Sequence, residues 1–466
     1  MPHWTAYAVL AYVLLQVALS AYVARRVKTE SDYLVAGRSL GLFLVSISLF
    51  ATWFGAETVM GAAGAVAGGG LSDGRADPFG YTICLLLMAF FLAYKMRAAN
   101  YMTFGDFFKN RFGPAAEKLA VLVMIPTSLM WAAAQILAFA TIFSAVTAID
   151  FDISMIVTVL ILVTYSSLGG MIGDVVTDVV EAGVIVIGLL IMLAIVMVKA
   201  GGIGPAFEGI DPSRLTLLSG GESLLAQFDG WAIPVIGSLV AQEAMSRLLA
   251  ARSPEVAKKA CIAGAFVYLI IGSIPLLIGL IGSGLIPAPE NADDFLPALA
   301  MHILPAPLYV LLLGALISAI LSTINSVLLG VTALTGHNII MPLLPGISER
   351  RKVLIEKGIV VLAGIVCYFM ATSGESIYEL ATLAASFGSA GLVVCALIGL
   401  NSRFGGALAA LATLIAGIVF TMLTEYIFEI DAPYLAALAG CIIVYGILGL
   451  FERNDLFLRS PRKRGS

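Results

Sequence analysis

The sequence predicts an all-α polytopic membrane protein with thirteen transmembrane helices. Apolar residues make up 60% of the 466-residue chain and charged residues only 12%, roughly half of what a soluble domain carries. The mean hydropathy is correspondingly high, at +1.01. Apolar runs of about twenty residues, the length that crosses a bilayer as a helix, recur along the whole chain. These observations exclude a soluble enzyme and a disordered chain.

Each apolar run is expected to form one membrane span. The thirteen predicted spans are 4–24, 40–66, 78–98, 115–146, 152–170, 174–199, 230–250, 255–285, 306–336, 353–373, 376–399, 404–425 and 432–452. The loops between them are too short for a soluble domain. We therefore expect residues 1–466 to form a single transmembrane domain.

The distribution of basic residues predicts the orientation of the chain. With the N-terminus outside, 23 of the 26 Lys and Arg residues fall in cytoplasmic loops, in the tail or at inner helix ends. The three exceptions are Arg75, Lys199 and Arg214. We therefore expect an outer N-terminus and a cytoplasmic C-terminus, in what we expect to be a bacterial inner (plasma) membrane.

The net charge and the positions of the cysteines exclude further classes of protein. The net charge of −4 gives no basic surface for a nucleic-acid backbone. The five cysteines lie in apolar runs without metal-binding spacing, so neither a disulfide framework nor a zinc site is expected. These residues are Cys84, Cys261, Cys367, Cys395 and Cys441.

The second span contains polar residues and glycines that indicate an interrupted helix. Trp53, Gly55, Glu57, Thr58 and Gly61 lie close together near its middle. A break there frees backbone carbonyls, which are oxygen ligands suited to a small cation. The alternative is that the glycines only allow close helix packing.

The seventh span shows the same irregularity. Pro234 and Gly237 are expected to disrupt the helix, with Gln242 and Glu243 nearer its inner end. A simple proline kink is the alternative. Spans two and seven are each followed by four regular spans, which divides the core into two five-helix units of opposite orientation. Paired broken helices at matching repeat positions indicate a central binding site.

This spacing also predicts the organisation of the chain. The predicted segments are a leading helix and loop (1–39), a first repeat (40–199), a second repeat (230–399), two trailing helices (404–452) and a basic cytoplasmic tail (453–466).

The ninth span carries a row of hydroxyl groups. Ala319, Ser322, Thr323 and Ser326 share one helical face, with Asn325 beside them. Their neutral oxygens suit Na⁺ better than a transition metal, which prefers His or Cys. The alternative is that the hydroxyls bond to carbonyls of their own helix.

Acidic residues mark the start of the sixth span. Asp174, Asp178 and Glu181 fall on one helical face without a basic neighbour in sequence. We expect them either to line a water-filled space or to face a cation. The alternative is that they lie at a solvated cytoplasmic helix end, and this alternative is strongest for Asp174. Glu379 stands alone early in span eleven, where an outer-end position is the simplest interpretation.

Four motifs in order resemble those of the sodium/solute symporter family, which includes sodium-coupled proline, galactose and choline transporters. They are SDYLVAGR at 31–38, Gly169-Gly170 followed by Thr177-Asp178, Ser246-Arg247, and the Ala319/Ser322/Thr323/Ser326 pattern. The resemblance covers nearly the whole chain. It implies a leucine-transporter-like inverted repeat of five plus five helices, with one helix before the core and two after it.

The resemblance also implies ion sites. The family's sodium ligands match the carbonyls of Ala51, Phe54 and Ala319 and the hydroxyls of Ser322 and Thr323. A second sodium site of some members matches Asp178, Asn325 and Ser326, where the asparagine departs from the usual small or acidic residue. Na⁺ is thus the expected coupling ion.

Among the family branches, the second span is most similar to the choline transporters. Trp53, Tyr81 and Trp131 match aromatic positions of a choline pocket, where stacked rings hold a quaternary ammonium. Ala241 and Glu379 replace tryptophans of that branch, and Glu57 replaces a glycine. The expected solute-binding residues are Trp53, Glu57, Thr58, Tyr81, Trp131, Gln242 and Glu243.

We therefore expect a sodium-coupled symporter that imports a small organic solute by alternating access. An unpaired Glu57 at membrane depth is expensive unless it holds a proton or meets a cation, which favours a choline-like amine or an amino acid. The alternatives are a Na⁺-coupled sugar or monocarboxylate symporter, and less strongly a channel or an integral-membrane enzyme. Three scattered histidines and the lack of an ATP-binding motif argue against an enzyme. The expected partners are the solute, Na⁺ and the lipid bilayer, without nucleic acid; the sequence leaves protein partners undetermined.

Overall fold

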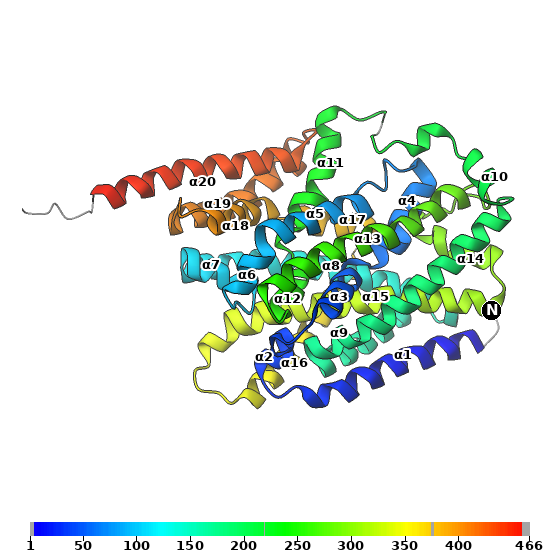
Figure 1. The fold of residues 1–466 in the computed structure, drawn as a ribbon, viewed down its shortest axis with the longest axis horizontal. Helices are drawn as coiled ribbons and strands as arrows, with labels where there is room; N and C mark the ends of the chain where they lie inside the picture. Colours follow the sequence, from blue (N-terminus) through cyan, green and yellow to red (C-terminus); the bar gives the residue numbers. More distant parts are fainter. Residues whose placement is uncertain (1–3, 219, 374–376, 459–466) are drawn as a thin grey trace, which may run out of the picture.

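The computed structural model describes residues 4–218, 220–373 and 377–458, which fold into a helical bundle (Figure 1). Within these ranges the extended structure amounts to one isolated bridge between Leu40 and Ala251. In Figure 1, α1 and α20 lie at opposite edges of the bundle. In chain order the helices are α1 (Trp4–Val23), α2 (Glu30–Val35), α3 (Leu42–Trp53), α4 (Ala62–Gly69), α5 (Tyr81–Met88), α6 (Tyr94–Ala98), α7 (Phe104–Phe112), α8 (Pro114–Thr147), α9 (Phe151–Lys199), α10 (Ile203–Glu208), α11 (Leu224–Ile236), α12 (Gln242–Ala250), α13 (Pro254–Gly282), α14 (Phe295–Ile303), α15 (Ala306–Thr335), α16 (Glu349–Ala371), α17 (Ile377–Ser386), α18 (Ser389–Asn401), α19 (Ala407–Met422) and α20 (Pro433–Leu458).

The long helices confirm a polytopic membrane protein. Among the described residues, eight helices are long and apolar enough to cross a membrane, or ten if each of two bent pairs forms one span. Two shorter apolar helices, Leu10–Val23 and Ser389–Asn401, accompany them. Large apolar side chains such as Leu14 and Ile443 point outward with 58% and 59% of their surface exposed. Such exposure suits a lipid-facing surface.

Helix α9 is a hairpin of two helices. Its 49 residues would measure about 74 Å if straight, against a hydrocarbon core of about 30 Å. The Tyr165 hydroxyl lies 2.5 Å from the Thr177 hydroxyl, although twelve residues of straight helix span about 18 Å. The chain folds back at Gly170, where φ is 54° and a Cβ atom would lie 2.7 Å from Tyr33. The turn agrees with the predicted boundary between spans 152–170 and 174–199.

Both predicted broken helices are present. Helix α3 and the segment Glu57–Gly69, a π-helical turn followed by α4, meet at an angle of 61°. The segment Leu224–Val240 and α12 meet at 46°. The first break falls at Phe54 and Gly55, as the sequence predicts.

The second break lies further along the chain than predicted. Pro234 stays inside α11, where its ring packs against Gly80, so the expectation that it disrupts the helix is wrong. Gly237 begins a 3₁₀ turn that reaches Val240, and the helix is interrupted at Ala241, whose ψ is 119°. The interruption places Gln242 and Glu243 in the first turn of α12.

Helix α15 forms the centre of the bundle. Every residue from Ala315 to Leu334 is buried, and the helix packs against α8 and α9. Polar side chains on α15 therefore face protein rather than lipid. The predicted row of hydroxyl groups on α15 lies against the first helix break.

Candidate sodium and solute sites

The oxygen atoms predicted to bind sodium converge at the first helix break. The Ser322 hydroxyl lies 3.0 Å from the carbonyl oxygens of both Ala51 and Ala319. The Thr323 hydroxyl lies 3.4 Å from the Ala51 carbonyl oxygen. All these residues are fully buried. Four of the five predicted ligands thus surround one point between α3 and α15.

The local chain path explains why the Ala51 carbonyl is available. In a continuous helix the N–H of Gly55 would donate to Ala51, but here it donates to Trp53 at 2.9 Å. The Ala51 oxygen turns instead to the two hydroxyls of α15. Gly55 passes so close to α15 that a Cβ atom would lie 2.9 Å from the Thr323 hydroxyl. Phe54, the fifth expected ligand, precedes Gly55 in the chain, and the role of its carbonyl stays a prediction.

The chemistry of this cluster suits a hard monovalent cation. Its members are neutral carbonyl and hydroxyl oxygens, the donors favoured by alkali and alkaline-earth ions over transition metals. Across the described part of the chain, no group of three His, Cys, Asp or Glu residues is arranged to hold a metal ion. The donor set therefore fits Na⁺ as a transported ion.

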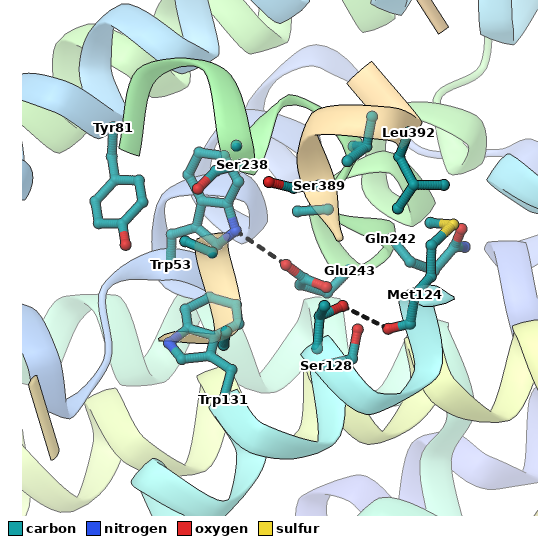
Figure 2. A pocket seen from close by; sticks show the side chains of 16 residues that line it. Trp53, Tyr81, Met124, Ser128, Trp131, Ser238, Gln242, Glu243, Ser389 and Leu392 are labelled. Atoms are coloured by element: carbon teal, nitrogen blue, oxygen red, sulfur yellow. Dashed lines mark hydrogen bonds between the residues drawn. The ribbon is translucent and has the colours of Figure 1, made fainter. Parts of the chain in front are cut away.

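A cavity with about 550 Å³ of empty space, including its open mouth, lies beside the break (Figure 2). Its lining includes five of the seven predicted solute-binding residues: Trp53, Tyr81, Trp131, Gln242 and Glu243. The rings of Trp53 and Tyr81 lie 5.4 Å apart. The Trp53 indole N–H donates to Glu243 at 3.3 Å, the contact drawn in Figure 2. Aromatic rings and a carboxylate thus share one wall.

Gln242 also lines the cavity, but its polar atoms already have protein partners. Its amide oxygen accepts from the Phe104 N–H at 2.8 Å, and its amide nitrogen donates to Ser246 at 2.9 Å. These bonds fix the side chain and leave mainly its stem for the cavity. Ala241, which replaces a tryptophan of the choline branch, lies in the lining as well. The Glu379 side chain lies outside the described residues.

Glu57 and Thr58 lie behind the cavity wall. Glu57 accepts a hydrogen bond from the Trp131 indole N–H and has 2% of its surface exposed. Thr58 donates to Asp77 at 2.5 Å and lies 3.0 Å from the Tyr268 hydroxyl. Neither residue lines the cavity, so any effect on a solute passes through neighbouring side chains such as Trp131, Tyr81 and Tyr268.

Sequence reasoning missed three residues that complete this region. Gln135 on α8 accepts the Ala56 N–H at 2.8 Å, which satisfies a backbone donor freed by the break. Asp77 and Tyr268 bond to each other at 2.9 Å and hold Thr58. Asp77 stands one residue before the predicted third span, 78–98, and therefore outside the segments in which a buried acid is expected. A buried glutamine in span four was the available signal for Gln135.

Three acidic side chains are buried in or next to the cavity. Glu57, Asp77 and Glu243 have exposed fractions of 2%, 1% and 3%. None of them takes part in the ion pairs formed within the described ranges. Burying an ionised carboxylate without a cation costs free energy, and a proton or a bound cation removes much of that cost.

Asp174 corrects the expectation of a solvated helix end. It is fully buried and forms an ion pair with Arg247 of α12, a basic partner that sequence spacing could not reveal. Asn325 donates to Asp174 at 2.5 Å, and Ser326 lies 3.3 Å from it. The structure therefore joins Asn325 and Ser326 to Asp174.

The third member of the predicted second sodium site lies apart. Asp178 accepts a hydrogen bond from Ser48 of α3, and its other carboxylate oxygen is buried without a hydrogen-bond partner. Glu181 accepts from the Tyr165 hydroxyl at 3.3 Å. No hydrogen bond links Asp178 to Asn325 or Ser326 in the described structure, and the role of this set in ion binding stays a prediction.

Two broken helices, a cluster of neutral oxygens at one break and a neighbouring cavity form the arrangement typical of a secondary transporter. The model of the sodium:solute symporter family matches residues 33–417. The chain belongs to this family, so it is a Na⁺-coupled solute symporter and not an enzyme. The match confirms the resemblance based on the four motifs.

Sequence relatives in this family differ in their named solutes. The chain is 26% identical over 397 residues to high affinity choline transporter 1 of Homo sapiens, covering 80% of this chain and 68% of that protein. It is 24% identical over 465 residues to the osmoregulated proline transporter OpuE of Bacillus subtilis (strain 168), covering 93% and 92%. It is 26% identical over 431 residues to sodium-coupled monocarboxylate transporter 1 of Xenopus laevis, covering 87% and 68%. The chain spans about two thirds of the length of the choline transporters it matches.

Solved structures confirm the leucine-transporter-like fold. A Na⁺-coupled sialic acid symporter in a substrate-bound, outward-open state has a TM-score of 0.86 at 19% identity, covering 96% of this chain and 97% of that chain. MHP1, a nucleobase-cation-symport-1 family transporter, has a TM-score of 0.62 at 15% identity, covering 92% and 96%.

Proposed function

We propose that this protein imports a small cationic or zwitterionic solute, a choline-like amine or an amino acid, together with Na⁺. The observation that supports this most is Glu243. It lines a cavity walled by Trp53, Tyr81 and Trp131, and no basic side chain pairs with it among the described residues. A cationic group seated there meets both a carboxylate and aromatic faces.

Coupling in this proposal follows from the position of the sodium cluster. Trp53 ends α3 one residue before Phe54, so the cavity and the Ala51 carbonyl share the same broken segment. Na⁺ bound there would order the segment that carries Trp53, so each ligand would raise the affinity for the other. One charge moving inward at 100 mV supplies about 2.3 kcal/mol toward a solute gradient.

The proposed topology has thirteen spans. The helices α17 and α18, interrupted at Gly388, cover the predicted span 376–399, and α1 covers 4–24. The eight long helices become ten with the two bent pairs and eleven when the two arms of α9 are counted separately. Adding α1 and the α17–α18 pair gives thirteen. This count supports repeats at 40–199 and 230–399, flanked by 1–39, 404–452 and the tail 453–466. From the distribution of Lys and Arg residues we propose an outer N-terminus and a cytoplasmic C-terminus, in a bacterial inner membrane.

A Na⁺-coupled monocarboxylate or sugar symporter is the second candidate, and the relative from Xenopus laevis favours the monocarboxylate. The three buried carboxylates argue against a monocarboxylate, because a bound anion would add to their repulsion. A sugar would leave the aromatic wall and Glu243 without a cation.

Uptake by purified protein in proteoliposomes tests the proposal. Radiolabelled choline, proline, other amino acids, galactose and lactate are compared under an inward Na⁺ gradient and under a matched K⁺ gradient. We expect Na⁺-dependent uptake of an amine or amino acid, and competition among such compounds. Na⁺-driven uptake of galactose or lactate alone would exclude the proposed solute class, although the sodium site would stand.

A further inference from the structure

Two of the three basic residues placed on the outer side, Arg75 and Arg214, are bonded in the structure. The Nη2 atom of Arg214 donates to the carbonyl oxygens of Val66 and Ala67, both at 2.8 Å. Its Nη1 atom donates to the Ser283 hydroxyl at 2.8 Å. Arg214 therefore joins the loop before α11 to the last turn of α4 and to the end of α13.

Arg75 follows α4 in the chain and contacts the segment that leads into α11. Its Nη1 atom lies 2.9 Å from one Glu222 carboxylate oxygen, and its Nη2 atom donates to the other at 3.3 Å. The guanidinium also lies against α11, because a Cβ atom on Gly230 would be 2.5 Å from Nη2. Since α4 and α11 belong to the two broken helices, this ion pair links one broken helix to the other.

Helix α11 is also bonded to the trailing helix α20. The buried Asp229 carboxylate accepts from the backbone N–H groups of Leu435 at 2.6 Å and Tyr434 at 3.3 Å, in the first turn of α20. The structure therefore contains two groups of helices at this end of the bundle, α4 with α13 and α11 with α20. The Arg75–Glu222 ion pair connects these two groups.

A second cavity, the outer cavity, lies beside this ion pair. It has about 980 Å³ of empty space, including its open mouth. Arg75, Glu222 and Gly230 line it, and Tyr81 lines both this cavity and the solute cavity. The two cavities are therefore neighbours, and a solute that passed from one to the other would pass Tyr81.

We propose that the outer cavity is the vestibule through which the solute enters, and that the Arg75–Glu222 ion pair is a latch that holds α11 beside α4. The inference rests on the proposed orientation of the chain and on the proposed solute cavity, and it adds the entry route. The side chains of Arg75 and Glu222 are 16% and 36% exposed, so water and salt weaken their attraction. An ion pair of this strength can break and re-form in each transport cycle.

Labelling of introduced cysteines in intact cells tests this inference without knowledge of the solute. The five native cysteines are buried, so a membrane-impermeant methanethiosulfonate reagent should report the introduced cysteine. Ser72→Cys reports access to the outer cavity, and Ser128→Cys reports access to the solute cavity. We expect Ser72→Cys to be labelled in every protein. Adding Arg75→Gln or Glu222→Gln should speed the labelling of Ser128→Cys about twofold to fivefold, the effect of losing a partly exposed ion pair.

Two further variants separate the ion pair from a general effect of charge. The Arg75→Gln/Glu222→Gln double variant should label Ser128→Cys no faster than either single variant, because all three lack the same interaction. Lys199→Gln removes an exposed basic residue at the end of α9 and should leave the rate at its wild-type value.

Each contrary result overturns a different part of the account. Unchanged labelling of Ser128→Cys in both single variants, or additive increases in the double variant, would overturn the latch. An equal increase in Lys199→Gln would assign the effect to charge alone and would also overturn it. Failure of Ser72→Cys to react would overturn the proposed orientation and the inference with it. The proposed solute class is tested separately, by uptake.

Discussion

The Ser322 hydroxyl lies 3.0 Å from the Ala51 carbonyl oxygen, although 271 residues separate them in the chain. The contact joins the central helix α15 to the end of α3, where the backbone leaves the helix. A cation shared by these two atoms would bind tightly only while α3 and α15 keep this spacing. Ion binding at these atoms would thereby be linked to the conformation of the solute cavity.

Replacement of Gly55 by alanine should weaken sodium dependence. A Cβ atom there would lie 2.7 Å from the Gln135 amide oxygen and 2.9 Å from the Thr323 hydroxyl. Such overpacking costs about 1–3 kcal/mol, so the Na⁺ concentration for half-maximal uptake should rise about tenfold. The matched control is Gly183→Ala, where no atom lies within 4 Å. An equal effect of both substitutions would remove the steric argument.

Removal of the carboxylate at Glu243 should reduce the affinity for a cationic solute. A hydrogen bond or ion pair to a charged group contributes about 1.5–3 kcal/mol, so Glu243→Gln should weaken binding about tenfold to a hundredfold. Competition by amines and amino acids in proteoliposomes measures the change. Glu290→Gln, an exposed loop variant, serves as the control. Unchanged competition in Glu243→Gln would exclude a direct contact between this residue and the solute.

Asp174→Asn should destabilise the protein more than Asp178→Asn. The first change leaves the Arg247 charge buried without its partner, which costs about 3–5 kcal/mol. The second removes a carboxylate that has no basic partner among the described residues and leaves an oxygen for the Ser48 hydroxyl. Thermal unfolding in detergent compares the two. A larger loss in Asp178→Asn would indicate that Asp174 is solvated after all.

The cluster formed by His337, Glu30 and Asp106 should make the stability of the protein depend on pH in the acidic range. The two ring nitrogens of His337 lie 2.8 Å from Glu30 and 3.3 Å from Asp106, which requires both nitrogens to donate. Burial alone would raise the pKa of each carboxyl, but hydrogen bonds and charge from His337, assisted by Lys352 at Glu30, hold both pKa values below their ordinary 4.5 and 3.8.

The sign of the dependence follows from these lowered pKa values. The stabilisation is fully present above pH 4.5 and is lost as the pH falls below it toward the folded-state values. The midpoint of thermal unfolding should therefore drop as the pH falls below the ordinary carboxyl pKa values of 4.5 and 3.8, and His337→Ala should flatten that drop. Parallel curves for the two proteins over this window would contradict the assigned role of His337.

Local patterns in the sequence predicted much of the site. Gly55 beside Glu57 indicated the first break, and the four-residue spacing of Ser322 and Ser326 placed hydroxyls on one face. Helix period and polar content are local properties, so they could be read without tertiary structure. The position of the second break could not, because Pro234 is accommodated by packing on Gly80 and the chain leaves the helix only at Ala241.

The sequence could not indicate which side chains pair with each other in the folded protein. Asp174 and Arg247 are 73 residues apart, and only the hairpin at Gly170 and the burial of α12 bring them together. The hydroxyl of Thr58 is likewise predicted to bind the solute, but in the structure it bonds to Asp77 and lies beside the Tyr268 hydroxyl. Long-range pairing decides these roles, and one sequence contains no periodic signal for it.

Sodium titration of uptake in the Ser322→Ala/Thr323→Ala double variant tests the central claim most directly. The variant removes both hydroxyls that face the Ala51 carbonyl, while Ser273→Ala removes a hydroxyl that bonds only to its own helix at 2.7 Å. We predict that the Na⁺ concentration for half-maximal uptake rises at least about tenfold in the double variant and stays at the wild-type value in Ser273→Ala. A folded double variant with unchanged Na⁺ dependence would show that sodium does not bind between α3 and α15.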